Sequence, residues 1–596
     1  MKELSKLQWV QRLGESFSLD LRSLALFRIC LASVILIDLV SRSRDFGAFY
    51  TDSGVLSCRQ AEAIFGKPLT WSFHLMSGAT TVQVALFALA GFFAVLMLVG
   101  SQTRIATVAS WVLLVSLHNR NPMNLHGGDY VLRHLLFWSM FLPLGACFSL
   151  DRSICPNPNR SLIILSAGTV GLTLQIFSIY FFSALAKTDA SWLVDHTAVY
   201  YALRLENTAK PFGQWLTQFP DFLKIVTVTT LKFEFYAPLI LIFISVRQFG
   251  RTFLVIAFIG FHIGLNLCLH LGMFGVICPL MWLALLPTRF WQIISVYKWI
   301  KINQSYTIFY DATCPFCLNM TRLVRTLLQI PVEWFKPAQS EPAIYILVQE
   351  HNSWIVVDSK GEQRYRFDGV IALLGVRPIF KPLQCVLSLR LSRSFGNLLY
   401  TWVANHRTTS GKIISTMSGR DPARRLPWYM EAIAGFFVLY VLLWNVRAIY
   451  PQSTVLFPRK VDFIAHLTRC DQRWNMFTPA PRHDGWFVMA AQLRDGSRVD
   501  LFRPHKKLSW RKPAFIYEEF STDRWRYFLW KWKAPSNRRS RFEYAGYLRQ
   551  QWNQVHPPSR RISRLRIYYF EETNLLNGEA SEPRPRLLWN KIYPAK

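Results

Sequence analysis

The chain has 596 residues, of which 51% are hydrophobic, 15% aromatic and 17% charged. A soluble protein of this size usually carries fewer apolar side chains, so the composition argues against an ordinary water-soluble enzyme and favours a membrane protein. The formal net charge of +32 does not by itself indicate nucleic acid, because basic residues of membrane proteins gather in cytoplasmic loops and against anionic headgroups. We therefore expect membrane lipids, and no nucleic acid, among the partners.

About 20 mainly apolar residues are needed to cross the bilayer. Eight or nine segments approach this length, at 22–41, 80–100, 103–118, 130–148, 161–186, 222–246, 252–270, 273–289 and 429–448. The stretch before the first run is too polar for a cleaved signal peptide, so that run should be an uncleaved span. Segments 252–270 and 273–289 are expected to form a broken pair.

Short loops with Lys and Arg predict the orientation, because such loops stay in the cytoplasm. With the N-terminus inside, the basic loops contain Lys2, Lys6, Arg12, Arg104, Arg152, Arg160, Arg247, Arg251, Arg289, Lys298 and Lys301. The longer loops and the C-terminal tail then lie outside. This assignment requires 252–289 to cross twice; otherwise the segment that follows changes sides.

Several ionisable side chains stand inside apolar runs, namely Arg28, Arg133, Glu234 and His262. A charge within the bilayer is costly unless it is paired, so such residues usually face the bundle interior. Each one alone is explained equally well by a structural ion pair or by a side chain that reaches the headgroups. Together they favour a polar cavity that opens on one side of the bundle.

Lys187 stands at the apolar end of a span, in QIFSIYFFSALAKTDASW. Desolvation of a lysine favours the neutral amine, which could accept a proton near neutral pH and serve as a general base. An ordinary interfacial lysine at the end of a span is the alternative. Position alone favours this alternative.

Four segments follow one another along the first half of the chain: SLALFRICLA; HNRNPMNLHGGDYVLRHLLFWSMFLPLG with FSLD; SALAKTDASW; and FHIGLNLCLHLGMF. In order and spacing they resemble the membrane domain shared by vitamin K-dependent gamma-carboxylase and its bacterial relatives, the horizontally transferred transmembrane (HTTM) family. The resemblance covers about residues 15–290. It implies a reduced, vitamin K-type quinone as cofactor, with oxygen and carbon dioxide as co-substrates if the chain is a carboxylase.

The same resemblance assigns roles to residues. Lys187 takes the place of the lysine before D-x-x-W, the proposed base that deprotonates the reduced quinone. The residues implied to line the pocket are His126, Asp129, Arg204, His262 and Asn266, and those expected to support it are Asp189, Trp192, Arg28 and Glu234. One departure concerns His126, because the carboxylase has an Asn-His pair where this chain has Leu125 and His126 followed by two glycines.

The segment SYTIFYDATCPFCLNMTRLVRTLL reads as a strand, a C-x-x-C turn and a helix. A helix N-terminus can stabilise the thiolate of Cys314, with Cys317 as its partner. Half of a zinc site is the alternative, but no second C-x-x-C or H-x-x-x-H follows, so no metal is predicted. YDATCPFC, FDGVIALL and LLYTWVANHR resemble the DCC family of thioredoxin-like thiol-disulfide oxidoreductases over about 304–408, with Ala312 where that family usually has glycine.

The C-terminal tail contains RWNMFTPAPRHDGWFVMAAQLRDGSRVDLF, an aromatic, proline-containing turn followed by alternating runs, and it resembles the extramembrane part of bacterial HTTM proteins. Two alternating runs around Asp495 and Gly496 predict a hairpin. The basic aromatic run STDRWRYFLWKWKAPSNRRSRF is either a membrane-facing helix or a helix with ordinary core aromatics. Cys58 and Cys470 stand alone in segments assigned to the outer face, which makes them candidates for a disulfide.

The expected fold is an α-helical polytopic membrane protein with a thioredoxin-like α/β insert and a C-terminal mixed, β-containing soluble tail. Its parts are a bundle at 15–290, the insert at 304–408, a last span at 429–448 and the tail at 450–596. We expect it in a bacterial inner membrane, with the N-terminus and insert cytoplasmic and the tail outside.

Two classes of function fit the sequence. The first is a quinone-linked, carboxylase-like enzyme in which Lys187 is the base, with a peptide or protein as substrate and a quinone reductase as partner. The second is a thiol-disulfide carrier or maturation factor, in which Cys314 and Cys317 move electrons and the bundle is only a scaffold. Retention of Lys187 and His262 supports the first class, and the intact C-x-x-C supports the second.

Overall fold

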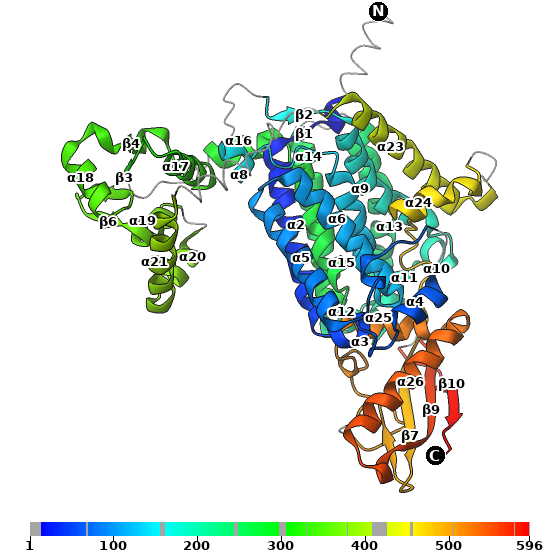
Figure 1. Cartoon of the computed structure of the whole chain (residues 1–596). Helices are drawn as coiled ribbons and strands as arrows, with labels where there is room; N and C mark the ends of the chain where they lie inside the picture. The colour runs from blue at the N-terminus through cyan, green and yellow to red at the C-terminus, as the bar shows by residue number, and fades with distance from the viewer. Residues whose placement is uncertain are drawn as a thin grey trace, which may run out of the picture.

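The computed structural model describes residues 14–66, 69–154, 161–243, 248–296, 306–328, 330–377, 380–407, 426–452, 457–504, 506–576 and 578–594. They form a helical bundle, an α/β insert and a β-containing tail. Figure 1 shows the insert near one end of the bundle and the tail at the other end.

Within the described residues, six helices are long and apolar enough to cross a membrane. These are α2 (Leu21–Ser43), α5 (Thr80–Val99), α9 (Ala167–Ala186), α13 (Pro220–Phe243), α14 (Gln248–Cys268) and α23 (Trp428–Ile449). The bundle also contains α6 (Thr103–Arg120), α7 (Gly127–Ser139), α15 (Met273–Met281) and the 3-10 turn η3 (Trp282–Leu285). The eight or nine spans expected from hydropathy are therefore six full-length helices and a few shorter or more polar ones.

Local sequence explains where the predicted and observed helices differ. The segment predicted as a span at 130–148 is helical only as far as Ser139, because Pro143 cannot continue a helix. The span predicted from 161 begins at Ala167, where the side chain of Ser166 caps the first turn. Ile163 and Ile164 belong instead to β2 (Ile163–Ile164), which pairs with β1 (Leu19–Asp20).

The chain from α14 to η3 leaves one end of the bundle and returns to it. At the start of α14, Arg251 donates to the carbonyl of Ser18. Just after η3, the carbonyl of Leu286 accepts a 2.7 Å hydrogen bond from Ser23. Since Ser18 and Ser23 lie together at the beginning of α2, residues 252–289 run the length of the bundle twice, as the orientation argument requires.

The insert contains a four-stranded mixed sheet in the order β4-β3-β5-β6. Its strands are β3 (Tyr306–Tyr310), β4 (Phe335–Pro337), β5 (Ile355–Asp358) and β6 (Gln363–Tyr365), and its helices are α17 (Pro315–Leu328), α18 (Pro342–Glu350), α19 (Arg366–Gly375), α20 (Lys381–Ser388) and α21 (Arg390–Asn405). Only β3 and β4 pair in parallel. The predicted strand, C-x-x-C turn and helix are present as β3 and α17.

The tail contains a four-stranded antiparallel sheet in the order β10-β9-β7-β8. Its elements are β7 (His483–Leu493), β8 (Arg498–Asp500), α25 (Asp523–Trp532), α26 (Arg538–Val555), β9 (Ile562–Thr573) and β10 (Arg584–Ile592). Gly496 turns the predicted β7–β8 hairpin with a φ of 84°.

The basic aromatic run forms α25 and the start of α26. Phe528, Leu529 and Trp532 of α25 are fully buried, so α25 is a packed helix and not a membrane-facing one.

Short helices complete the connections: α3 (Phe46–Tyr50), α4 (Cys58–Phe65), α8 (Leu150–Ile154), α10 (Ala190–Leu193), α11 (Ala198–Arg204), α12 (Pro211–Leu216), α16 (Thr288–Val296) and α24 (Asp462–Thr468). The span α23 joins the two ends. Near its start, Glu431 accepts from the backbone of Ala167 at the beginning of α9. Near its end, Trp444 donates to the carbonyl of Gln472 at the start of the tail. The helix α23 therefore runs from the end of the bundle near the insert to the end that carries the tail.

Candidate functional site

Lys187 directly follows α9 and is buried, with 3% of its surface exposed. Its ammonium donates to Glu234 Oε2 on α13 at 2.6 Å and to Ser183 Oγ one turn back at 2.7 Å. The ring of Trp192 lies 5.0 Å from Nζ, which adds a cation–π contact. The sequence predicted Glu234 only as a supporting residue, whereas the structure makes it the direct carboxylate partner of Lys187, able to take or return a proton.

His262 on α14 belongs to a second buried polar group. Tyr180 hydroxyl lies 2.6 Å from His262 Nε2 and accepts a 2.9 Å hydrogen bond from Trp282 Nε1. Because Trp282 can only donate, the tyrosine proton is free to point at Nε2, and in that arrangement the imidazole proton is on Nδ1. Nδ1 is buried without a hydrogen-bond partner in the described structure.

These two groups share one cavity of about 450 Å³. Lys187, Glu234, His262 and Tyr180 lie on its wall, and the rest of the lining is mostly aliphatic and aromatic. The tail contributes to the same wall through Met476 and Phe477. Trp192 Nε1 donates to the Phe477 carbonyl at 3.0 Å, which holds the tail against this end of the bundle. The site is therefore an apolar chamber with a few polar groups, the usual character of a small-molecule site.

The structure does not place two residues of the expected pocket on this cavity. Asn266 is one turn beyond His262, but its side chain donates to the Gly275 carbonyl and ties α14 to α15. Arg204 ends α11 and donates to the carbonyl of Gly578 at 2.6 Å, which ties the bundle to the tail. Both side chains therefore join elements, whereas their chain neighbours Leu203 and Leu265 line the cavity.

His126 and Asp129 lie in a separate ionic cluster, where the bundle meets α25. Asp129 binds Arg42 of α2 at 2.5 Å and Arg524 of α25 at 2.5 Å. Arg524 also binds Asp38 at 2.6 Å. His126 caps α7, and its backbone N–H donates to Asp129. The expected polar turn is thus a structural joint between bundle and tail rather than part of the Lys187 cavity.

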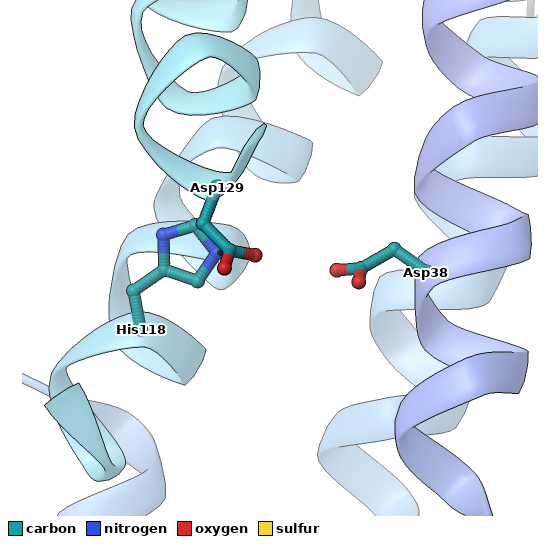
Figure 2. Close-up of side chains that lie close together, drawn as sticks. All are labelled: Asp38, His118 and Asp129. Carbon is teal, nitrogen blue, oxygen red and sulfur yellow. Dashed lines mark ion pairs between the residues drawn. The ribbon is translucent and has the colours of Figure 1, made fainter. Parts of the chain in front are cut away.

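Figure 2 shows Asp38, His118 and Asp129 together, with Asp38 on α2 facing the other two. Their donor atoms lie within 4.8 Å of one another, the arrangement that a metal ion would need. Two guanidinium groups, from Arg42 and Arg524, already balance the charge of the two carboxylates. A divalent cation would have to displace them, so these residues do not fit a metal centre.

The remaining supporting residues act locally. Asp189 caps α10 by accepting from the backbone N–H of Ser191. Arg28 is fully buried in α2, and its guanidinium donates to the carbonyl of Phe148 at 2.5 Å. Arg133, also fully buried, donates to the carbonyl of Asp471 in the tail. Neither arginine lies on the Lys187 cavity.

The disulfide expected between Cys58 and Cys470 is not formed, because both are free thiols. Cys58 Sγ donates to the carbonyl of His74 at 3.5 Å, and the buried Cys470 Sγ lies 3.9 Å from the carbonyl of Thr468. Each thiol is packed with its own neighbours. Position on the same side of the bundle was the only basis for pairing them, and it does not fix a distance.

The second site is the C-x-x-C turn of the insert. Cys314 precedes α17, and the backbone N–H of Cys317 in the first turn donates to Cys314 Sγ at 3.5 Å. Burial raises the pKa of Cys317 to about 12, which keeps it a neutral thiol. An apolar cavity of about 270 Å³ adjoins Cys317, with Arg407 at its wall. The arrangement provides one thiol at a helix start and a buried second thiol, as a dithiol redox pair requires.

The sequence analysis did not identify several residues of the Lys187 cavity and of the ionic cluster around Asp129. Tyr180 and Ser183 precede Lys187 by seven and four positions, the spacing of one helix face, so helical periodicity could have found them. Trp282, Phe477 and Arg524 come from distant segments. No local pattern places them, because packing between helices decides which of their faces meet.

The fold and the two sites define a redox-related integral membrane protein, a polytopic helical bundle that carries a C-x-x-C domain. Residues 18–291 match the HTTM domain, and residues 308–412 match the DCC1-like thiol-disulfide oxidoreductase. The chain is therefore a fusion of an HTTM domain and a DCC1-like domain, which confirms both resemblances seen in the sequence. No curated protein and no solved structure gave a significant match.

Proposed function

We propose that this chain is a membrane-bound, quinone-linked redox enzyme in which Lys187 is the proton acceptor. The observation that carries the proposal is the cavity of about 450 Å³, where the Lys187–Glu234 pair and His262 meet an otherwise apolar wall. An aromatic ring with oxygens at its edge fits such a chamber, because the ring needs apolar contacts and the oxygens need a few donors. His262 also lines this cavity, and its Nδ1 has no hydrogen-bond partner in the described structure.

Bound in the cavity, a reduced quinone would supply the reducing equivalents and, on reaction with oxygen, a base strong enough to remove a carbon-bound proton before carbon dioxide adds. The residues of this chain have simpler tasks. Lys187 takes a proton from a hydroxyl after passing its own to Glu234, since proton transfer within the pair leaves both groups neutral in an apolar site. His262, held by Tyr180, donates from Nδ1 to a second oxygen. The aromatic wall and Phe477 exclude water.

The first test is mass spectrometry of the purified protein with its co-purifying lipids. A quinone bound to the native chain, and retained by Lys224→Ala, supports the proposal, because Lys224 is an exposed lysine on α13 away from the cavity. Failure of the native chain to retain any quinone, or to bind one added in lipid nanodiscs, would overturn it.

The second test is the oxygen-dependent consumption of reduced quinone. Lys187→Ala should lower it by roughly 10²–10⁴-fold, the usual contribution of a general base. Lys187→Arg should fail as well, because a guanidinium keeps its proton. Full activity in Lys187→Arg would show that only positive charge is needed, and Lys187 would then be a structural residue.

A thiol-disulfide carrier is the second candidate, favoured by the geometry of Cys314 and Cys317. In that case the bundle only anchors the insert, and a protein or peptide is the substrate. Cys314→Ser should abolish dithiol exchange and leave quinone consumption intact if the two sites work separately. Loss of both activities would show that the thiols supply the quinone with electrons, directly or through a separate quinone reductase.

A further inference from the structure

The outer side of the insert carries an apolar surface on α20 and α21. On α21, Leu391, Phe395, Leu398 and Trp402 follow one another at intervals of four, three and four, so they share one helix face. Their exposed fractions are 86%, 67%, 70% and 59%. Val386 of α20 extends this surface with 55% exposed. A patch of this kind is rare on a soluble domain and marks a binding surface.

The opposite face of α21 is occupied. Gly396 packs against the ring of Phe367, and Leu399, Tyr400 and Val403 line the apolar cavity beside Cys317. The helix therefore has one face directed to the core of the insert and another that no described residue covers. The helix α21 is amphipathic, and its inner face forms a wall of the thiol site.

Charge and attachment indicate what covers the outer face. Lys381 and Arg390 are exposed at the starts of α20 and α21, where they can meet anionic headgroups. The insert is joined to the bundle on both sides, through α16 before it and α23 after it, so it cannot move far from the membrane. In Figure 1 the hairpin projects from the insert toward the level of the spans.

We propose that the α20–α21 hairpin docks into the surface of the lipid bilayer and holds the C-x-x-C domain against the membrane. Its apolar face lies among the acyl chains, Trp402 lies at headgroup depth and the two cations contact anionic lipid. The cavity beside Cys317 then lies next to the bilayer. This proposal does not depend on whether Lys187 is a base.

The experiment uses the full chain, one copy per nanodisc of phosphatidylcholine and phosphatidylglycerol. A benzophenone-maleimide is attached to Leu398→Cys, irradiated, and its adducts are identified by mass spectrometry of that peptide. The matched control is Ile346→Cys on α18, because Ile346 is also apolar and 64% exposed. Lipid adducts should be several-fold more abundant at position 398 than at 346. Val386→Cys should behave like Leu398→Cys.

The other outcomes each decide against the proposal. Equal lipid adducts at positions 398 and 346 would mean that proximity to the disc, and not the hairpin, governs labelling. Cross-links from position 398 to peptides of the same chain would mean that the hairpin packs on protein. A protein captured only when cell extract is added, with no lipid adduct before, would replace the bilayer by a protein partner. Normal dithiol titration of each variant confirms that the insert is folded.

Discussion

At the residue scale, Lys187 and Glu234 depend on each other, because each is a charge removed from water. Breaking such a pair by removing one partner typically costs 3–5 kcal/mol, about what an uncompensated buried charge costs. Glu234→Gln should therefore lower the free energy of unfolding in mild detergent by roughly this amount. The double variant Lys187→Met, Glu234→Gln should recover most of the loss.

The measurement for this pair is a double-mutant cycle by chemical denaturation. If the effects of Lys187→Met and Glu234→Gln simply add, the two side chains do not interact, and the proton exchange proposed between them loses its basis. The control is Lys224→Met, which replaces an exposed lysine on the same helix as Glu234 and should change the free energy of unfolding little.

The thiols of the insert should differ in their reaction with iodoacetamide, because the thiolate is the reacting form. The pKa of Cys317 is raised from 9.0 to about 12 by burial, so the fraction ionised near neutral pH is very small and rises only as the pH approaches about 12. At about pH 8, peptide mapping should find Cys314 modified and Cys317 intact. The exposed Cys385 reports reagent access. Equal modification of Cys314 and Cys317 would contradict the buried position of Cys317.

Single residues were predictable where a motif fixes their chemistry. The spacing within each motif identifies Cys314 and Cys317 of the C-x-x-C and the lysine before D-x-x-W. The partner of Lys187 did not, although Glu234 was noticed as an ionisable group in an apolar run. The two residues are 47 positions apart on different helices. The sequence of either helix does not determine how the two helices align when they pack. For the same reason His126 and Asp129 were assigned to the wrong neighbourhood.

At the scale of elements, Arg524 supplies the buried ion pairs between α25 and the bundle, and Arg526 and Lys531 add hydrogen bonds to backbone carbonyls. Arg524→Met leaves Asp38 and Asp129 with Arg42 alone, so one buried carboxylate loses its counter-charge. The expected loss of stability is roughly 3–5 kcal/mol, as for other broken buried pairs. Limited proteolysis should then cut between the bundle and the tail, and thermal unfolding should begin at a lower temperature.

The control for this joint is Glu206→Gln, which removes a partly exposed ion pair with Lys512 of the tail and leaves Lys512 paired with Glu572. Because water screens the Lys512–Glu206 pair, its loss should lower the stability less than Arg524→Met does. If Arg524→Met is as mild as Glu206→Gln, the ionic cluster is not what holds α25, and the aromatic contacts of Phe49 with Trp525 and Phe528 would carry the joint.

Hydropathy and turn residues predicted the type of each element, but they did not always predict where an element begins or ends. Long apolar runs gave α2, α5 and α14 nearly as observed. The run at 130–148 gave a helix that is too long, because a hydropathy count does not register that Pro143 breaks the backbone pattern. The basic aromatic run of α25 is ambiguous in sequence, since aromatic and cationic residues suit both a membrane surface and a charged, buried joint.

At the scale of the whole molecule, basic residues gather at the end of the bundle where the insert is attached. Arg22, Arg104, Arg152, Arg251 and Arg289 lie there. Lys and Arg in short loops next to spans are usually retained inside, so these residues favour a cytoplasmic location for the insert.

We expect the insert and the tail on opposite sides of the membrane, because α23 is long and apolar enough to span it and runs between the two ends of the bundle. We therefore expect Lys360→Cys in the insert and Arg498→Cys in the tail to react with a membrane-impermeant maleimide from opposite sides. Both positions are exposed turn or strand residues away from the two cavities. In intact bacterial cells with a permeabilised outer membrane, Arg498→Cys should be labelled and Lys360→Cys protected, and inverted inner-membrane vesicles should reverse the result. Labelling of both from one side would mean that α23 does not span, and labelling in the reversed sense would place the thiols outside and the Lys187 end within the cytoplasm.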